Sequence, residues 1–295
     1  MHGIIVIDKP GGPTSAEVVR LVKSRLGRAT RVGHLGTLDP FATGVLPILI
    51  GEGTKLAPFL QEGEKEYAGV IKLGAETDTL DRTGAVTRTA PVPLLEAARL
   101  AAVAAGFVGV IEQTPPIFSA IKRAGVPLYK LAHKGVEIAP PAPRKVHIAQ
   151  LELEAAGAEM IRFNVVCSSG MYVRSLARDI GVALGTAGHL DELRRLRNGS
   201  FSLDEAVGLE SALAALERGG DPGLVSIRAA LAAVPEIEVD AKTERSLRNG
   251  DSRALDGLAP RDAELFKVIA RGNLVAVAEP VSRLTSTIAR IFNAE

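Results

Sequence analysis

One short segment of the chain, GHLGTLDPFATGVLP at residues 33–47, combines residue types that could carry out chemistry. It places a single carboxylate, Asp39, among glycines, prolines and small hydroxylated side chains, with the imidazole of His34 five positions upstream. Pro40 disfavours the helical region for the residue before it, so we expect a loop here and not a helix. Glycines on both sides would let the backbone of another molecule approach closely. The segment therefore predicts a loop that presents one carboxylate to a ligand.

A carboxylate that attacks a carbon atom or removes a proton must stay ionised in a place that excludes water. Desolvation alone would raise its pKa, so it needs a cationic partner. Arg174 is the best candidate, because it is predicted to lie in the first turn of a helix that follows a strand. Taken alone, however, Asp39 is more often a turn or cap residue. Arg174 alone would equally suit a surface ion pair.

The sequence does not indicate other familiar chemistry. GEGTK at 51–55 lacks the spacing of a phosphate-binding loop, and GVALGTAG at 181–188 lacks the glycine pattern of a dinucleotide site. The five histidines show no metal-ligand spacing, and the single cysteine, Cys167, excludes an internal disulfide and a multi-cysteine zinc site. We therefore expect neither a metal ion nor a nucleotide cofactor.

The composition indicates a globular chain without a membrane segment. With 295 residues, 46% of them hydrophobic, it can bury a large core, and we expect one large and one small domain. The longest apolar run, residues 100–111, falls short of the roughly 20 residues that a membrane span needs. The N-terminus, MHGIIVIDKP, lacks the basic start and cleavage site of a signal peptide. We expect a cytoplasmic protein.

The net charge is only +1, but the basic residues are unevenly distributed. No acidic residue occurs from Val18 to Leu38, a window that contains Arg20, Lys23, Arg25, Arg28, Arg31 and His34. A second acid-poor run, residues 118–136, contains Lys122, Arg123, Lys130, His133 and Lys134. Such patches can follow phosphates by charge alone, although either run could also be an ordinary solvated face.

Hydrophobic periodicity places the elements that must position these residues. We expect buried strands at 3–8, 45–50, 67–74 and 160–167, with Pro47 marking an edge or an irregularity in the second. Thr14 and Glu17 predict a capping box for a helix that Gly27 ends and that turns Arg20 and Lys23 to solvent. Further helices are expected from about Pro93 to Ala105 and from near Met171.

The last part of the chain has a different pattern. ERGGDPG at 217–223 predicts a linker, followed by a short apolar helix at 224–234. Beyond it we expect a strand near 235, a short helix ending at Gly250 and a hairpin around Gly272–Asn273. We therefore predict two domains, residues 1–234 and residues 235–295.

Several segments together resemble a known family. GHLGTLDPFATGVLP is similar to the catalytic motif of bacterial TruB-type tRNA pseudouridine synthases, usually written G-H-x-G-T-L-D-P-x-A-x-G-x-L-P. The resemblance continues, in the same order along the chain, through residues 8–15, 65–84, 113–122, 170–181 and 189–199. Any one of these segments is moderately specific, and five in the right order are strong.

The resemblance implies isomerisation of uridine to pseudouridine at position 55, in the T-arm of tRNA, with no metal, redox agent or nucleotide consumed. By the same resemblance Asp39 is the catalytic carboxylate and acts on a flipped-out uridine. Whether it attacks C1′, attacks C6 or deprotonates C2′ is left open. Tyr67 matches the tyrosine that stacks on the base and is the candidate for removing the C5 proton, and Arg174 matches the arginine that pairs with the aspartate.

Five further residues are expected to bind the substrate. Leu193 corresponds to a residue that packs against the base, and His34 to a histidine that contacts the T-loop where the uridine has left the stack. Tyr172 is expected to shape the pocket. Extrusion of the base costs a few kcal/mol, which contacts to phosphates must help to recover. This need gives Arg20 and Lys23 a role in binding RNA.

The fold implied is α+β: a large mixed, mostly antiparallel sheet flanked by helices, with Asp39, Tyr67 and Arg174 in a central cleft. A small β-rich, PUA-like RNA-binding domain follows. tRNA is the expected partner, no cofactor is expected, and the protein is expected to be a monomer. Two other classes share some of these features: a non-catalytic RNA-binding or tRNA-folding module, and a small-molecule nucleoside enzyme. A pure binder has no use for an ionised carboxylate facing phosphates, and the basic runs and the extra domain argue against the second.

Overall fold

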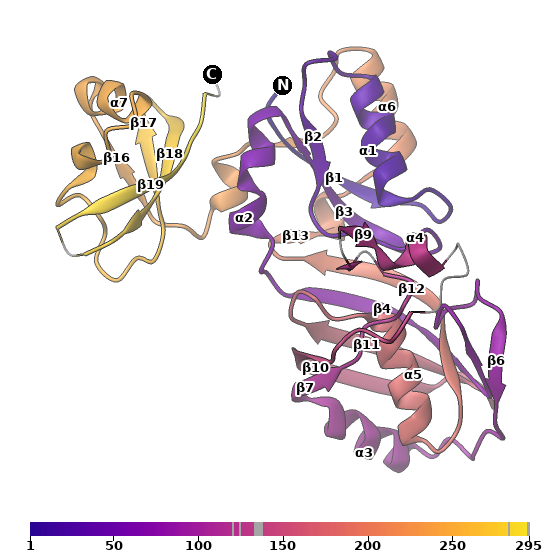
Figure 1. Cartoon of the computed structure of the whole chain (residues 1–295). Coiled ribbons are helices and arrows are strands. Elements are labelled where there is room, and N and C mark those ends of the chain that lie inside the picture. Colours follow the sequence, from indigo (N-terminus) through magenta and orange to yellow (C-terminus); the bar gives the residue numbers. More distant parts are fainter. Residues whose placement is uncertain (120, 124, 133–137, 283, 294–295) are drawn as a thin grey trace.

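The computed structural model describes residues 1–119, 121–123, 125–132, 138–282 and 284–293, and within them one large sheet organises the chain (Figure 1). This sheet has eleven strands with the main order β14-β1-β3-β12-β4-β11-β10-β7. Only the β1–β14 and β12–β3 pairs are parallel, so the predicted mixed, mostly antiparallel sheet is confirmed. Its strands are β1 Gly3–Lys9, β2 Val32–His34, β3 Thr43–Ile50, β4 Lys65–Leu73, β7 Gly109–Gln113, β10 Arg144–Ala155, β11 Met160–Cys167, β12 Gly188–Asn198, β13 Phe201–Ser202, β14 Val207–Gly208 and β15 Leu224–Val225.

The two halves of this sheet differ in how they are covered. β1 and β3 are almost continuously apolar and are buried on both faces, as expected for strands packed between two layers. In β1, Ile5 and Ile7 enter the core beneath the helices, whereas Ile4 and Val6 enter a second core on the opposite face. β10 and β11 instead alternate between buried and exposed residues. One face of that half of the sheet is therefore open to solvent.

Four helices contribute to the same core and so cover the same face of the sheet: α1 Ser15–Ser24, α3 Ala97–Phe107, α5 Val173–Ala183 and α6 Leu209–Glu217. α1 and α6 lie over the β1–β3 end and α3 and α5 over the β4–β10 end (Figure 1). The predicted capping box is present, since Thr14 Oγ1 accepts a hydrogen bond from Glu17 N and Thr14 N donates to Glu17 Oε2. α1 ends at Ser24, three residues before Gly27.

One predicted helix begins later than expected, and another does not form. α3 begins at Ala97, not at Pro93, because Val92 and Leu95 pack on the core from an extended segment. The apolar segment 224–234 forms no regular helix: its start is β15, which pairs with β1, and its end is the single 3-10 turn η3 Ala229–Leu231. Pairing with the free edge of β1 satisfies more backbone groups there than one isolated short helix would.

Pro47 lies inside β3, which is not an edge strand. It stands at a point where β3 pairs with neither β12 nor β2. β12 pairs with β3 only at Thr43 and Gly44, and β2 pairs with it only from Ile48 onward. Between these two partners the Pro47 carbonyl accepts a hydrogen bond from Leu35 N, at the start of the segment that leads to Asp39. The gap in the sheet is thus the place where the glycine-rich loop enters.

A second sheet of four strands, β16-β17-β18-β19, forms near the C-terminal end of the described residues. The predicted hairpin is β17–β18, but its turn is Arg271–Gly272, both at positive φ (51° and 79°), one residue earlier than expected. The elements are β16 Glu236–Glu238, α7 Ala241–Arg248, η4 Ser252–Leu255, β17 Phe266–Ala270, β18 Asn273–Pro280 and β19 Ser286–Ile291. The smaller elements elsewhere are η1 Gly51–Leu56, α2 Ala57–Leu60, β5 Ala75–Thr77, β6 Val86–Thr89, β8 Lys122–Arg123, β9 Val126–Pro127, α4 Leu128–Ala132 and η2 Leu203–Glu205.

The predicted boundary at 234/235 falls between β15 of the large sheet and β16 of the small one. The apolar core is not divided at this point, because one cluster joins Ile4 and Leu56 of the first part to Val277 and Phe292 of the second. The two-domain division stays a prediction, and the shared core indicates two units packed against each other. Throughout the described ranges, no helix is long and apolar enough to cross a membrane.

Candidate active site

Asp39 lies in the loop between β2 and β3, and its carboxylate meets the guanidinium of Arg174. Arg174 Nε donates to Asp39 Oδ2 at 2.9 Å, and the terminal nitrogen Nη2 donates to Oδ1 at 3.2 Å. The two residues are 135 positions apart in the chain. Such a two-point contact fixes the orientation of a carboxylate as well as its position. Asp39 keeps 30% of its side chain exposed, so the carboxylate remains reachable from solvent.

Arg174 connects three segments of the chain. It is the second residue of α5, whose N-cap is Tyr172, and its side chain is only 7% exposed. Besides Asp39, it donates to the carbonyl oxygens of Thr79 and Phe118, both at 2.9 Å. A planar guanidinium with five N–H donors can serve all of these acceptors at once, which a lysine cannot do.

A second carboxylate, Asp81, also faces Arg174. Its Oδ2 lies 3.8 Å from Arg174 Nε, and its Oδ1 accepts hydrogen bonds from Thr79 Oγ1 and Thr83 N, both at 2.9 Å. Leu80, between Thr79 and Asp81, has φ at 62°, a conformation that is costly for a leucine and is typical of functional sites. Asp81 was missed from the sequence, although it lies in residues 65–84, one of the segments that carry the resemblance.

The electrostatic balance at Asp39 differs from the expectation that an arginine alone keeps it ionised. The surrounding protein desolvates the carboxylate and raises its pKa above the usual aspartate value, while Arg174 opposes this shift and Asp81 adds to it. The positive charge of Lys9 also lowers the pKa of Asp39, by a smaller amount. A raised pKa makes Asp39 a stronger base than an aspartate at the surface.

The loop is fixed on the C-terminal side of Asp39 by Lys9, the last residue of β1. The buried Nζ donates to Pro40 O at 3.1 Å, Ala42 O at 2.7 Å and Pro10 O at 2.9 Å. Burial lowers the pKa of Lys9 to about 8. On the other side of Asp39, Ser15 Oγ accepts from Leu38 N and donates to Leu38 O, at 2.9 and 3.0 Å.

The first half of the loop is fixed by β12. Arg195 is fully buried and donates to Val45 O at 2.7 Å, Gly36 O at 3.0 Å and Thr37 O at 3.4 Å. Asn198 Nδ2 donates to Leu35 O at 2.7 Å. Among the described residues, Arg195 has no carboxylate within ion-pair distance. Its charge is compensated by the carbonyl groups that it holds, so the loop conformation and the buried cation stabilise each other.

Sequence reasoning gave no role to Lys9, Ser15, Arg195 or Asn198. All four lie in segments that carry the resemblance, residues 8–15 and 189–199. The available signal was a polar side chain at the inward position of an apolar strand, as at Lys9. Such a residue needs buried partners, but the sequence does not say which ones.

Tyr67 and Leu193 lie on one face of the large sheet. Tyr67 of β4 pairs with Arg195 of β12, and Leu193 of β12 pairs with Gly69 of β4, so their side chains share the face toward the helices. Both are buried, at 6% and 7% exposure. Burial is the main cause that raises the pKa of Tyr67, and the charge of Asp39 contributes in the same direction. The phenol is therefore neutral at physiological pH.

Two of the other predicted residues flank this region. His34 ends β2 and is half-buried, and burial followed by the charge of Arg195 lowers its pKa. Within the described part of the chain its Nδ1 has no hydrogen-bond partner. Tyr172 exchanges hydrogen bonds with Gln113 and lies under the guanidinium of Arg144, 4.6 Å from the ring centre.

Arg20 and Lys23 lie on the exposed side of α1. Arg20 pairs with Glu17 at 3.2 Å, with 75% of its side chain exposed. Lys23 is also exposed. Of the second basic run, Lys122, Arg123 and Lys130 are exposed, whereas His133 and Lys134 lie outside the described residues. No group of three or more metal-binding side chains occurs in the ranges that the structure covers.

Comparison with solved structures defines the class of fold. The chain superposes on a chain of a Cbf5–Nop10–Gar1 complex with a TM-score of 0.71 at 25% sequence identity, covering 98% of this chain and 84% of that one. The fold is the pseudouridine synthase fold, a large mixed sheet with helices, together with a small C-terminal β sheet.

The sequence comparisons agree and are more specific. Residues 23–173 match the family described as TruB family pseudouridylate synthase (N terminal domain), and residues 174–231 match the tRNA pseudouridylate synthase B C-terminal domain. The protein is 43% identical over 287 residues to tRNA pseudouridine synthase B of Geotalea uraniireducens, covering 95% of this chain and 92% of that protein. The enzyme of the same name from Geobacter sulfurreducens is 40% identical over 306 residues, covering 99% and 100%. The chain belongs to the TruB family of pseudouridine synthases.

Proposed function

We propose that this enzyme converts uridine to pseudouridine at position 55, in the T-arm loop of tRNA, and that Asp39 is the carboxylate that acts on the flipped-out nucleotide. The relatives' shared name, tRNA pseudouridine synthase B, supports tRNA as the substrate. The observation that carries the role of Asp39 is its geometry: a partly exposed carboxylate, oriented by Arg174, in a loop whose backbone is fixed on both sides.

The reaction is an isomerisation and consumes nothing. The N1–C1′ bond breaks, C5 bonds to C1′, the proton on C5 is lost and N1 gains a proton. Asp39 is the group for the step at the sugar or ring, and its raised pKa suits either nucleophilic attack or proton removal. The base must stay in place while it turns, which requires a site that holds it on both sides.

The other side chains divide into positioning and binding roles. Arg174 positions Asp39, and Tyr67 and Leu193 provide a shared surface against which the base can stack. Tyr67 is neutral, so removal of the C5 proton by its phenol requires that the proton pass onward in the same step. Tyr172 borders the pocket and His34 contacts the T-loop. Arg20 and Lys23 provide charge for the RNA backbone at the exposed side of α1.

The remaining parts of the proposal concern the wider molecule. Residues 235–295 act as a PUA-like RNA-binding unit beside the catalytic domain, residues 1–234. The enzyme works as a monomer in the cytoplasm without a cofactor. These statements rest on the resemblance of the sequence motifs and on the acid-poor basic window from Val18 to Leu38.

The decisive test is the substitution Asp39→Asn, assayed on a T-arm stem-loop by mapping pseudouridine. We expect turnover to be abolished while the dissociation constant for the stem-loop stays within about tenfold, because Asn keeps the shape of the side chain and loses its charge. Asp8→Asn is the matched control, since Asp8 also receives two hydrogen bonds from one arginine, Arg194, at 3.1 and 2.8 Å.

We expect the control variant to retain most of its turnover. A comparable rate for Asp39→Asn would show that Asp39 is not the reacting group. Tight binding by the unmodified protein with no turnover at all would instead favour the non-catalytic RNA-binding module.

A further inference from the structure

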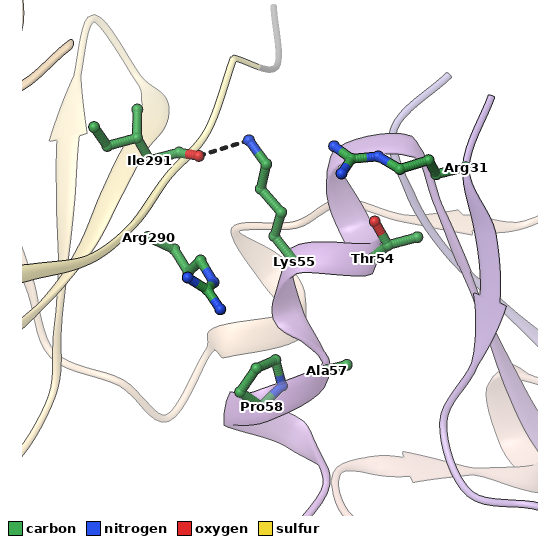
Figure 2. A pocket seen from close by; sticks show the side chains of 7 residues that line it. All are labelled: Arg31, Thr54, Lys55, Ala57, Pro58, Arg290 and Ile291. Carbon is green, nitrogen blue, oxygen red and sulfur yellow. Dashed lines mark hydrogen bonds between the residues drawn. The ribbon is translucent and has the colours of Figure 1, made fainter. Parts of the chain in front are cut away.

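A hollow of about 470 Å³, whose lining does not include Asp39, lies between the large sheet and the C-terminal sheet (Figure 2). Its floor on one side is η1 and the start of α2, with Thr54, Ala57 and Pro58, and its other side is the end of β19. Three of the side chains that line it are cationic: Arg31, Lys55 and Arg290. They come from three separate segments and both parts of the molecule.

The carboxylate of Glu52 holds together residues around this hollow. Its carboxylate receives a hydrogen bond from Lys55 Nζ at 2.6 Å and one from the backbone N–H of Asn293 at 2.7 Å, and lies 3.5 Å from Arg31. Lys55 in turn donates to Ile291 O at 2.8 Å (Figure 2). The fully buried Phe292 lies between these two contacts and belongs to the core that both sheets share. The positions of Arg31 and Lys55 are therefore set by one network, and Arg290 is the residue before Ile291, whose carbonyl oxygen belongs to that network.

The cations retain donors that the network does not use. Lys55 has three N–H groups and uses two, for Glu52 and Ile291. Arg31 is 64% exposed, and its ion pair with Glu52 is at 3.5 Å. Arg290 is exposed, and within the described ranges its guanidinium donates only to the neighbouring Ala289 O, at 3.4 Å. Among the described residues that line the hollow or join its network, three positive charges face the one carboxylate of Glu52, an excess of two.

From this geometry we infer that the hollow binds the sugar–phosphate backbone of the RNA substrate. Guanidinium groups suit phosphate oxygens because their N–H donors form paired hydrogen bonds. The apolar surfaces of Ala57 and Pro58 and the hydroxyl of Thr54 suit a sugar next to the phosphate. This inference rests on the proposed function, since it requires RNA as the substrate.

The position of Arg31 connects this site to the catalytic loop. Arg31 directly precedes β2, and His34 ends that strand, so the two lie about 10 Å apart along an extended chain. An RNA strand that reaches His34 can thus continue over Arg31 into the hollow. The consequence is a phosphate site that exists only while the two sheets keep their relative position.

The test uses Arg290→Ala and Arg290→Glu in the full-length protein, because Arg290 is exposed and its loss should not disturb the fold. Arg261→Ala is the matched control: it removes an exposed arginine from the same part of the chain, outside the hollow. The dissociation constant of an unmodified tRNA transcript is measured from about 50 to about 200 mM salt, together with kcat at saturating tRNA.

We expect Arg290→Ala to weaken tRNA binding by about three- to tenfold, to reduce the slope of log K against log salt by about 1, and to leave kcat unchanged. Arg290→Glu should weaken binding further, and Arg261→Ala should match the unmodified protein. Unchanged affinity and slope for Arg290→Ala, or an equal loss for Arg261→Ala, would overturn the site. Pseudouridine formation by the unmodified protein is measured separately. If the hollow does not bind RNA but pseudouridine still forms, only this inference fails. If no pseudouridine forms, the proposed function itself fails.

Discussion

The catalytic loop and the junction between the two sheets each contain a carboxylate surrounded by cations, but the two carboxylates behave in opposite ways. Asp39 is 30% exposed and Glu52 only 11%, yet the pKa of Asp39 is raised and that of Glu52 is lowered. Exposure of the side chain therefore does not decide the direction of the shift at these two positions.

The difference lies both in how strongly the surrounding protein desolvates each carboxylate, more at Asp39 than at Glu52, and in the partners of each. Desolvation raises the pKa of both groups, and at Glu52 it is outweighed by the N–H of Asn293, by Lys55 and by Arg31. At Asp39 the one arginine in direct contact is shared with a second carboxylate, Asp81, and also serves two carbonyl oxygens. A carboxylate that receives several hydrogen bonds of its own is suited to stabilising the fold. One that shares its cation with a second carboxylate stays basic and can react.

The largest effect is expected for Arg195, which holds the loop that carries Asp39. Arg195→Met would leave the carbonyls of Gly36, Thr37 and Val45 without their buried donor, so the free energy of unfolding should fall by about 3 kcal/mol. Denaturant unfolding measures the loss, and hydrogen exchange of the amides of residues 36–47 should accelerate.

Arg197→Met controls for the removal of an arginine from β12, since Arg197 is half-buried and pairs with Glu64 and Glu66. It should change stability by about 1 kcal/mol or less. Equal losses in the two variants would show that the loop does not depend on Arg195.

A second test concerns the sharing of Arg174. Arg174→Lys cannot hold both oxygens of Asp39 together with the carbonyls of Thr79 and Phe118, so kcat should fall by about a hundredfold while the affinity for RNA changes little. Lysine keeps the positive charge but loses part of the hydrogen bonding that also lowers the pKa of Asp39, so the acid limb of the kcat–pH profile should move modestly to higher pH.

Arg178→Lys is the matched control for Arg174→Lys. It lies one turn further along α5 and pairs with Asp179 at 2.7 Å. Its profile and kcat should match those of the unmodified enzyme. If the acid limb of the Arg174→Lys profile stayed at the same pH as in the unmodified enzyme, Arg174 would not influence the ionisation of Asp39.

The opposite pKa shifts of the two carboxylates predict opposite pH dependences of stability. Glu52 has a lowered folded-state pKa, so its contribution is present above the unfolded value and is lost as the pH falls through the folded value. Glu52→Gln should therefore be less stable than the unmodified protein near neutral pH, and the difference should shrink in acid.

For Asp39, whose folded-state pKa is raised, the contribution is present at low pH and is lost as the pH rises through that value. Asp39→Asn should therefore gain stability relative to the unmodified protein as the pH rises. Unfolding free energies measured from about pH 4 to about pH 8 test both variants. If the unfolding free energies of the two variants changed with pH in the same way, the two carboxylates would not have opposite pKa shifts.

The smallest effects are expected on the exposed face of α1. Arg20→Ala and Lys23→Ala should each weaken RNA binding by about threefold and lower the salt slope by about 1, without a change in saturated turnover. The effect of Arg20 should be the smaller of the two, because Glu17 already pairs with it. An unchanged dissociation constant in both variants would remove this helix from the RNA interface.

Local patterns along the chain determined much of the fold. The capping box at Thr14, the strand from Met160 to Cys167 and the buried stripe of α5 could all be read from sequence, because each depends on residues within a few positions of one another. The same holds for the carboxylate loop around Asp39, whose residue types are adjacent. The helix that was expected at 224–234 failed because its partner, the edge of β1, lies more than 200 residues away.

The tertiary structure alone decided which side chains complete the site. Lys9, Arg195 and Asn198 reach the loop from strands that are distant in the chain, and strand register brings them there. Asp81 reaches Arg174 from a turn that is also distant in sequence. The same is true of the junction, where Arg31, Lys55 and Arg290 converge. A sequence specifies the type and order of side chains, whereas the pKa of a carboxylate depends on which charges and donors surround it in space. That arrangement exists only after the sheets have paired and packed.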